Sequence, residues 1–132
     1  MTGEMTPGER ITYARSRSNM LLVGSEPRVD AVISAVTGLP AQALPEWADP
    51  DDEQVLAEPG GVPQTVLVRN VQALTAAQQQ RLFEAIGVWQ GRVRVIATAP
   101  APVYPLVSSQ LFNERLYYRL NMLCLDPMAV EV

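Results

Sequence analysis

The stretch of residues 65–71 constrains the fold more than any other part of this sequence. It opens with a continuous run of apolar and β-branched residues, TVLV, and the polar residues Arg69 and Asn70 follow directly. Such a run is typical of a strand that is buried on both faces of a parallel sheet. Open α/β sheets bind ligands at the carboxyl edge of their strands. Arg69 and Asn70 therefore stand where an enzyme of this architecture places its reactive side chains.

Strand and helix patterns alternate along the chain. The alternation predicts a mostly parallel, five-stranded sheet in a three-layer α/β/α arrangement with right-handed crossovers. The expected strands cover residues 19–23, 43–47, 65–71, 92–98 and 122–125. The expected helices cover about 25–37, with Gly38 at its exit, 75–87, with Thr75 as N-cap, and 106–120.

Composition excludes several classes of function. With 132 residues the chain predicts one domain, residues 19–132, after a polar lead-in over 1–18. A net charge of −4 without a basic stripe argues against direct nucleic-acid binding, and no apolar run is long enough to span a membrane. The single cysteine, Cys124, excludes an internal disulfide and favours a reducing, cytoplasmic setting, with its side chain expected in the core.

The chain contains no histidine, which removes Ser-His and Cys-His nucleophile pairs and imidazole metal ligands. The acidic run over residues 49–53 has the composition of a metal site, but a solvated helix N-terminus is the stronger interpretation. We therefore expect no metal and no cofactor. Trp47 is expected to cover the edge of the core.

A glycine turn links the first predicted strand to the first predicted helix, as in a phosphate-binding loop. That loop requires GxxxxGK followed by serine or threonine, because its backbone amides cradle phosphate and its lysine neutralises it. Here Gly24 is followed at the required spacing by Val29, Asp30 and Ala31. Asp30 would repel a triphosphate where lysine should attract it. The residues predict that this loop does not bind nucleotide.

Several segments resemble the central AAA+ ATPase domain of bacterial sigma-54-dependent transcription activators, in the same order. Residues 112–121, FNERLYYRLN, are similar to the family's FREDLYYRLN, and residues 94–98 are similar to its RVIAAT strand. Residues 60–61 and 65–74 resemble GGTLFLDEIGEL, and residues 79–86 resemble the QAKLLRVL helix. The resemblance implies a P-loop NTPase-like core.

The sequence departs from the family pattern at its catalytic positions. The resemblance places Arg69 and Asn70 where the family has the Asp-Glu pair that holds magnesium and orients water. It places Pro100 at the phosphate-sensing asparagine. Of the two arginines that the family offers to a neighbour's nucleotide, the first corresponds to Asn113 and only Arg119 matches.

The resemblance runs from about residue 19 to 125 and implies a degenerate, truncated AAA+ domain. No GAFTGA-like segment is present, and the chain stops where the family's helical lid begins. Because family geometry brings the two motifs together, we expect Arg69 and Asp30 to form a salt bridge in the former nucleotide pocket.

Two classes of function remain. The first is a non-catalytic regulatory or interaction module whose partner is an intact AAA+ activator, a signalling protein or another copy of the chain. The second is a nucleotide binder or weak ATPase that uses the same cleft with different residues. A receiver-like domain is a third option, weakened because the first strand ends in Val23-Gly24-Ser25 without an acidic cluster. The candidates for the interaction surface are Arg115, Tyr117, Tyr118 and Arg119.

Overall fold

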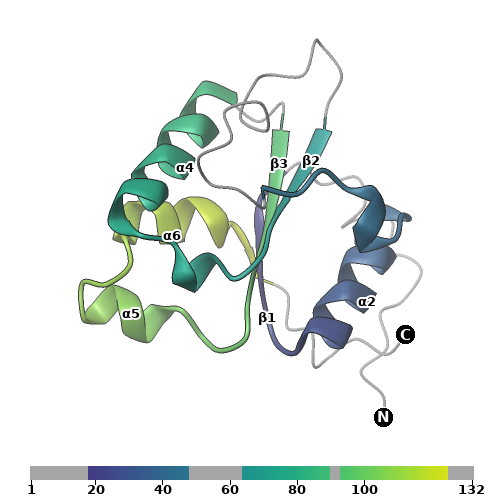
Figure 1. Cartoon of the computed structure of the whole chain (residues 1–132), viewed down its shortest axis with the longest axis horizontal. Coiled ribbons are helices and arrows are strands. Elements are labelled where there is room, and N and C mark those ends of the chain that lie inside the picture. The colour runs from purple at the N-terminus through teal and green to yellow at the C-terminus, as the bar shows by residue number, and fades with distance from the viewer. Residues whose placement is uncertain (1–17, 48–63, 90–92, 125–132) are drawn as a thin grey trace.

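A single parallel sheet forms the centre of the protein (Figure 1). The computed structural model describes residues 18–47, 64–89 and 93–124. Within them, four strands are arranged in the order β2-β3-β1-β4, and every pair is parallel. The strands are β1 (Met20–Val23), β2 (Gln64–Val68), β3 (Val93–Ala99) and β4 (Leu123–Cys124). The predicted α/β class with a parallel sheet is confirmed.

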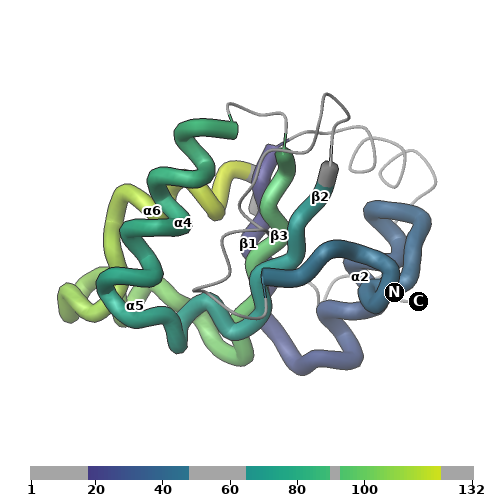
Figure 2. The backbone as a smooth tube through the Cα atoms, turned by 45° about the horizontal axis from the view of Figure 1, so that its top comes forward, coloured from purple at the N-terminus to yellow at the C-terminus, as the bar shows by residue number. Residues whose placement is uncertain are grey.

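Helices cover both faces of this sheet, and the two views of the backbone agree on their placement (Figures 1 and 2). Helix α2 (Glu26–Thr37) lies on one face. The opposite face carries α4 (Ala76–Trp89), α5 (Tyr104–Ser108) and α6 (Glu114–Leu120). The predicted three-layer arrangement is therefore present.

The core has two halves because successive side chains of a strand point to opposite faces. Leu67 and Ile96 pack with Val32 and Ile33 of α2 in one apolar cluster. The second cluster lies on the other face and joins the strands to α4, α5 and α6 through Val66, Val68, Val95, Ala97, Leu82, Val107, Leu116 and Leu120. Both faces of β2 and β3 are thus buried, as the apolar run of residues 65–68 predicted for β2.

The ends of α2 and α4 follow their sequence signals. Ser25 occupies the N-cap position of α2, although its side chain makes no capping hydrogen bond, and Gly38 ends that helix with a φ of 75°, a left-handed conformation that glycine adopts without strain. Thr75 and Gln78 form a reciprocal capping pair at α4: Gln78 N–H donates to Thr75 Oγ1, and Thr75 N–H donates to Gln78 Oε1. The helix runs past Gly87, expected near its end, to the buried Trp89.

The predicted strand over 43–47 is reduced to a single bridge. Residues Ala41–Ala43 form the 3-10 helix η1, and Glu46 then pairs with Leu67. Leu67 N–H donates to the Pro45 carbonyl and Trp47 N–H donates to the Leu67 carbonyl. Pro45 has no amide hydrogen and therefore cannot extend the ladder toward residue 43. The expected count of five strands is therefore wrong for the described residues, and β2 lies at the edge of the four-strand order.

The single helix predicted over 106–120 is wrong. The chain forms α5 and α6 instead, separated by a turn in which Gln110 has a φ of 64°. Asn113 starts the second helix, because its side chain accepts a hydrogen bond from Leu116 N–H at 3.0 Å. Asparagine favours such a cap over a helix interior, where its side chain competes with the backbone.

Some predictions lie outside the described residues. They concern the lead-in up to residue 17, the acidic run over 49–53, and the Gly60-Gly61 pair. The backbone of Cys124 belongs to β4, and its side chain is outside the description. Among the described helices, none has the length and apolar composition that crossing a membrane requires.

Candidate functional site

The carboxyl edge of the sheet brings the ends of β1, β2 and β3 together. After β2, the chain passes through Arg69 and turns at Asn70, which has a φ of 53°. Asparagine tolerates this left-handed conformation better than most residues. The Asn70 amide donates to Thr98 Oγ1 of β3 at 3.3 Å, and the 3-10 helix η2 (Val71–Ala73) follows. Asn70 thus acts through its backbone, and its side chain is exposed.

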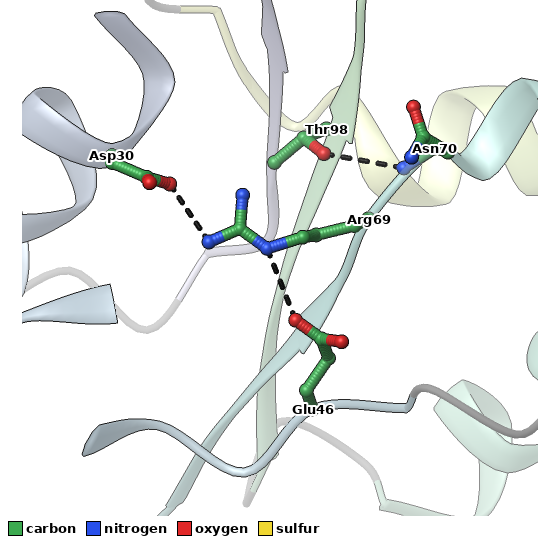
Figure 3. Close-up of polar contacts among 5 residues, drawn as sticks. All are labelled: Asp30, Glu46, Arg69, Asn70 and Thr98. Atoms are coloured by element: carbon green, nitrogen blue, oxygen red, sulfur yellow. Dashed lines mark hydrogen bonds and ion pairs between the residues drawn. The ribbon is translucent and has the colours of Figure 1, made fainter. Parts of the chain in front are cut away.

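Arg69 extends from this edge between two carboxylates (Figure 3). Its Nη2 lies 2.8 Å from Asp30 Oδ1 on α2. Its Nε donates to Glu46 Oε1 at 3.0 Å, in the segment that pairs with β2. We call Asp30, Glu46 and Arg69 the Arg69 cluster. The predicted Arg69–Asp30 salt bridge is present, whereas the part played by Glu46 had no signal in the sequence pattern.

The environment of Arg69 keeps it charged. Partial burial of the guanidinium lowers its pKa, but the hydrogen bonds and negative charges of Asp30 and Glu46 raise it by more. The net result is a pKa above the usual value of arginine. Its side chain is 21% exposed and those of both acids are 38% exposed, so water screens the cluster partly.

The turn between β1 and α2 is too short for a phosphate-binding loop. Only Gly24 and Ser25 separate the two elements, and the Gly24 amide already donates to the Ala99 carbonyl at 3.0 Å. Val29 is buried in the core, and Asp30 pairs with Arg69. Pro27 removes an amide donor from the first turn of α2, and that turn also carries the acidic Glu26. These features disfavour an anion at this helix end.

Pro100 lies directly after β3 at the same edge and is exposed. It has neither an amide hydrogen nor a polar side-chain atom with which to contact a phosphate. No group of three or more potential metal-binding side chains occurs within residues 18–47, 64–89 and 93–124.

The predicted interaction residues all belong to α6, on the face of the sheet opposite α2. Arg115, Tyr118 and Arg119 are exposed. Tyr117 is only partly exposed: it packs against the core, and its ring makes edge contacts with Tyr104 and Tyr118 at centroid distances of 5.6 and 5.3 Å. Three of the four predicted residues therefore face solvent, and Tyr117 contacts one of them, Tyr118.

A groove lies between α4 and α6. It measures about 570 Å³ and is lined by Phe83, Arg115, Tyr118, Arg119 and Met122. We call it the α4–α6 groove. An adjoining groove of about 760 Å³ shares Phe83 and Arg115 with it and extends toward α5. Neither groove includes a member of the Arg69 cluster.

Three amide side chains hold α6 in place, and sequence reasoning did not assign them this role. Asn19 donates to the Arg119 carbonyl at 2.9 Å and accepts from Val95 N–H at 2.8 Å. Gln79 of α4 is buried. It donates to the carbonyls of Leu74 and Leu111 and accepts from the Asn113 amide at 2.7 Å. The third is Asn113, the cap of α6.

The position of Gln79 in the sequence does indicate that its side chain is buried. It lies three residues before Leu82 and seven before Ile86, and so on the same apolar stripe of α4. A polar residue on that stripe is buried and needs partners.

Comparison with known proteins identifies the family of this chain. Residues 48–128 match the model of the Sigma-54 interaction domain family. A search of curated protein sequences finds no match.

Among solved structures, NtrX from Brucella abortus has the same fold. One NtrX structure aligns with a TM-score of 0.64 at 15% identity and covers 89% of this chain. Structures of NtrX in complex with ATP and with ADP align with TM-scores of 0.65 and 0.63, at 15% and 16% identity. The chain spans about one third of the length of these NtrX chains, 33–34%.

Proposed function

Because this chain belongs to the Sigma-54 interaction domain family, we propose that it is a non-catalytic regulatory module that acts by binding another protein. The candidate partners are an intact AAA+ activator, a signalling protein or a second copy of the chain. The proposal includes the loss of nucleotide binding and hydrolysis.

The Arg69 cluster is the observation that carries this proposal. Phosphoryl transfer needs a cation held against the phosphates and a residue that orients the attacking water. The resemblance to AAA+ domains assigns these tasks to the positions of Arg69 and Asn70. A guanidinium cannot bind a metal cation, and an amide cannot act as a base. Arg69 is moreover already neutralised by Asp30 and Glu46.

The rest of the edge supports the same proposal. The sequence contains no lysine, so no ammonium side chain is present to neutralise a phosphate. Asp30 stands where the phosphate-binding-loop pattern requires that lysine, and its carboxylate pairs with Arg69. A triphosphate entering here would have to break an ion pair and meet two carboxylates.

The family and the exposed face of α6 support a protein partner. The family is described as an interaction domain, and Arg115, Tyr118 and Arg119 present charge and aromatic surface to solvent. Arginine and tyrosine are enriched at the centres of protein interfaces.

A second candidate function is nucleotide binding at a diverged site. The structures of NtrX in complex with ATP and ADP, which share this fold, favour it. It would need phosphate contacts other than those of the family pattern.

Thermal unfolding with increasing ATP or ADP, each with and without Mg²⁺, separates the two candidates. Our proposal predicts no dose-dependent rise in the unfolding temperature. A ligand at about 100 times its Kd would stabilise the fold by about 2.7 kcal/mol, which is easily detected. A saturable rise that disappears in Asp30→Ala or Arg69→Ala would establish the second candidate. In parallel, capture from the native cell tests whether an activator or a sigma factor is retained.

A further inference from the structure

We propose that the α4–α6 groove docks an acidic polypeptide segment that carries a bulky apolar side chain. This inference rests on the proposed protein-binding function and specifies the chemistry of the partner. It concerns a face of the sheet remote from the Arg69 cluster.

Apolar surface is concentrated around this groove. Of the six large hydrophobic residues that are exposed in the described part of the chain, four line this groove or the adjoining one: Tyr104, Leu111, Tyr118 and Met122. Tyr118 and Met122 line the groove and are 56% and 59% exposed. A cluster of this kind marks a binding surface more often than isolated exposed residues do. An apolar side chain of the partner would fill the space beside Phe83.

The charge of the groove selects an acidic partner. Arg119 lies over the Phe83 ring at 4.9 Å from its centroid, which leaves the edge of the guanidinium available for hydrogen bonds. Neither Arg119 nor Arg115 forms an ion pair with an acid of the described residues, in contrast to Arg69. The one acid at the adjoining groove is Glu114. Two arginines against one acid favour carboxylates on the partner.

The groove is pre-organised. Asn19 fixes the last turn of α6 through the Arg119 carbonyl, and Gln79 and Asn113 fix its first turn. The ring of Tyr117 makes an edge contact with the ring of Tyr118. A surface held in this way loses little conformational freedom when a partner binds.

The combination of features favours a polypeptide over a small anion. A free anion would contact the arginines but leave Tyr118 and Met122 exposed to water. A segment with both carboxylates and an apolar anchor satisfies the charge and buries the apolar surface together. Two adjoining grooves also offer an extended surface rather than a closed pocket.

Fluorescence anisotropy with a labelled peptide, Asp-Glu-Asp-Phe-Glu-Asp-Leu-Asp, tests this proposal on the full chain. We expect saturable binding that weakens as NaCl rises from about 50 to about 300 mM, because the Debye length falls below about 10 Å. Two control peptides are expected to bind about tenfold more weakly. One replaces Phe and Leu by Ser, and the other replaces the acids by Asn and Gln.

Three groove variants and one matched control complete the test. Arg115→Glu, Arg119→Glu and Tyr118→Ser should each weaken binding about tenfold or more, which is about 1.4 kcal/mol. Arg119→Glu also removes the contact with Phe83. Arg115→Glu and Tyr118→Ser change exposed side chains, so their effect on binding does not depend on that contact. Arg28→Glu makes the same charge change on α2, across the sheet, and should leave the affinity unchanged.

Three results would overturn the proposal: absence of peptide binding, equal affinity in the groove variants, or displacement of the peptide by ATP at stoichiometric concentration. The last would identify an anion site instead. Failure of peptide binding leaves the nucleotide experiment on the Arg69 cluster unaffected, so the two proposals fail separately.

Discussion

The two faces of this protein use the same side chain for opposite purposes. At the carboxyl edge, Arg69 is enclosed by Asp30 and Glu46 of the same chain. On α6, Arg115 and Arg119 lie in solvent next to aromatic rings, and no described acid pairs with them. In our proposal, Arg69 stabilises the fold because its counter-charge is internal, whereas Arg115 and Arg119 attract a partner. The presence or absence of a pairing acid among the described residues is therefore what distinguishes the Arg69 cluster from the α4–α6 groove.

The largest expected effect comes from the support of α6. Gln79→Leu removes three hydrogen bonds and leaves the Asn113 amide without its partner. An unsatisfied buried polar group costs about 1–3 kcal/mol, so we expect about 2 kcal/mol lower stability in chemical denaturation. Peptide binding at the α4–α6 groove should weaken as well.

Gln80→Leu is the matched control for this prediction. Gln80 is exposed on the same helix, so its replacement should change stability by less than about 0.5 kcal/mol. Equal losses in both variants would contradict the assignment of Gln79 as the support of α6.

The second prediction concerns the Arg69 cluster. Arg69→Ala leaves Asp30 and Glu46 without a cation, and we expect about 1 kcal/mol of destabilisation because water screens both acids. Arg69→Lys should fall between wild type and Arg69→Ala, since one ammonium does not reproduce the fork geometry. Peptide affinity should not change in either variant. A loss of peptide binding would break the separation of the two faces.

The third prediction tests the cap of α6. Asn113→Ala removes the acceptor for Leu116 N–H and should cost about 1 kcal/mol. Asn113→Asp keeps an acceptor and adds a favourable charge at a helix N-terminus, so it should retain stability. Both variants are measured by denaturation, and equal losses would show that the cap is not the source of the effect.

The smallest expected effect is a shift in the pH at which the Tyr118 phenol ionises. The charge of the Tyr104 phenolate, partial burial and the Glu114 carboxylate raise the pKa of Tyr118 above its usual value. Because the folded pKa exceeds the unfolded one, the associated stabilisation is complete below the unfolded pKa. It is lost as the pH rises through the folded pKa.

Ultraviolet titration in the alkaline range measures the ionisation of the Tyr118 phenol. In Glu114→Gln we expect this ionisation at lower pH. In Tyr118→Phe the contribution of this phenol to the titration curve should disappear. Unchanged titration curves would place Tyr118 away from these neighbours.

Local patterns predicted the elements that depend on them alone. The buried runs of β1 and β3, the stripe of α2 and the capping signals at Gly38 and Thr75 are all present. The elements that were predicted wrongly depend on other features of the chain. The strand expected before residue 48 lost its ladder at Pro45, and the last helix was divided by the cap at Asn113.

The residues of the candidate site show the same difference between local and long-range information. The Arg69–Asp30 pair was predicted because a family resemblance supplied its long-range geometry. Glu46 was missed because nothing in its local sequence places it beside β2, 23 residues before Arg69. The position of Gln79 on the apolar stripe of α4 indicates that it is buried, but its partners are backbone groups of Leu74, Leu111 and Asn113, which the sequence does not identify.

The most direct test of the account is isothermal titration of the wild-type protein with two ligands under one set of conditions. We predict saturable heat from the acidic peptide and none from ATP with Mg²⁺. The pattern expected of the second candidate is the reverse: saturable heat from ATP that is abolished in Arg69→Ala, with none from the peptide. That result would contradict the assignment of the Arg69 cluster to the fold and of the α4–α6 groove to the partner.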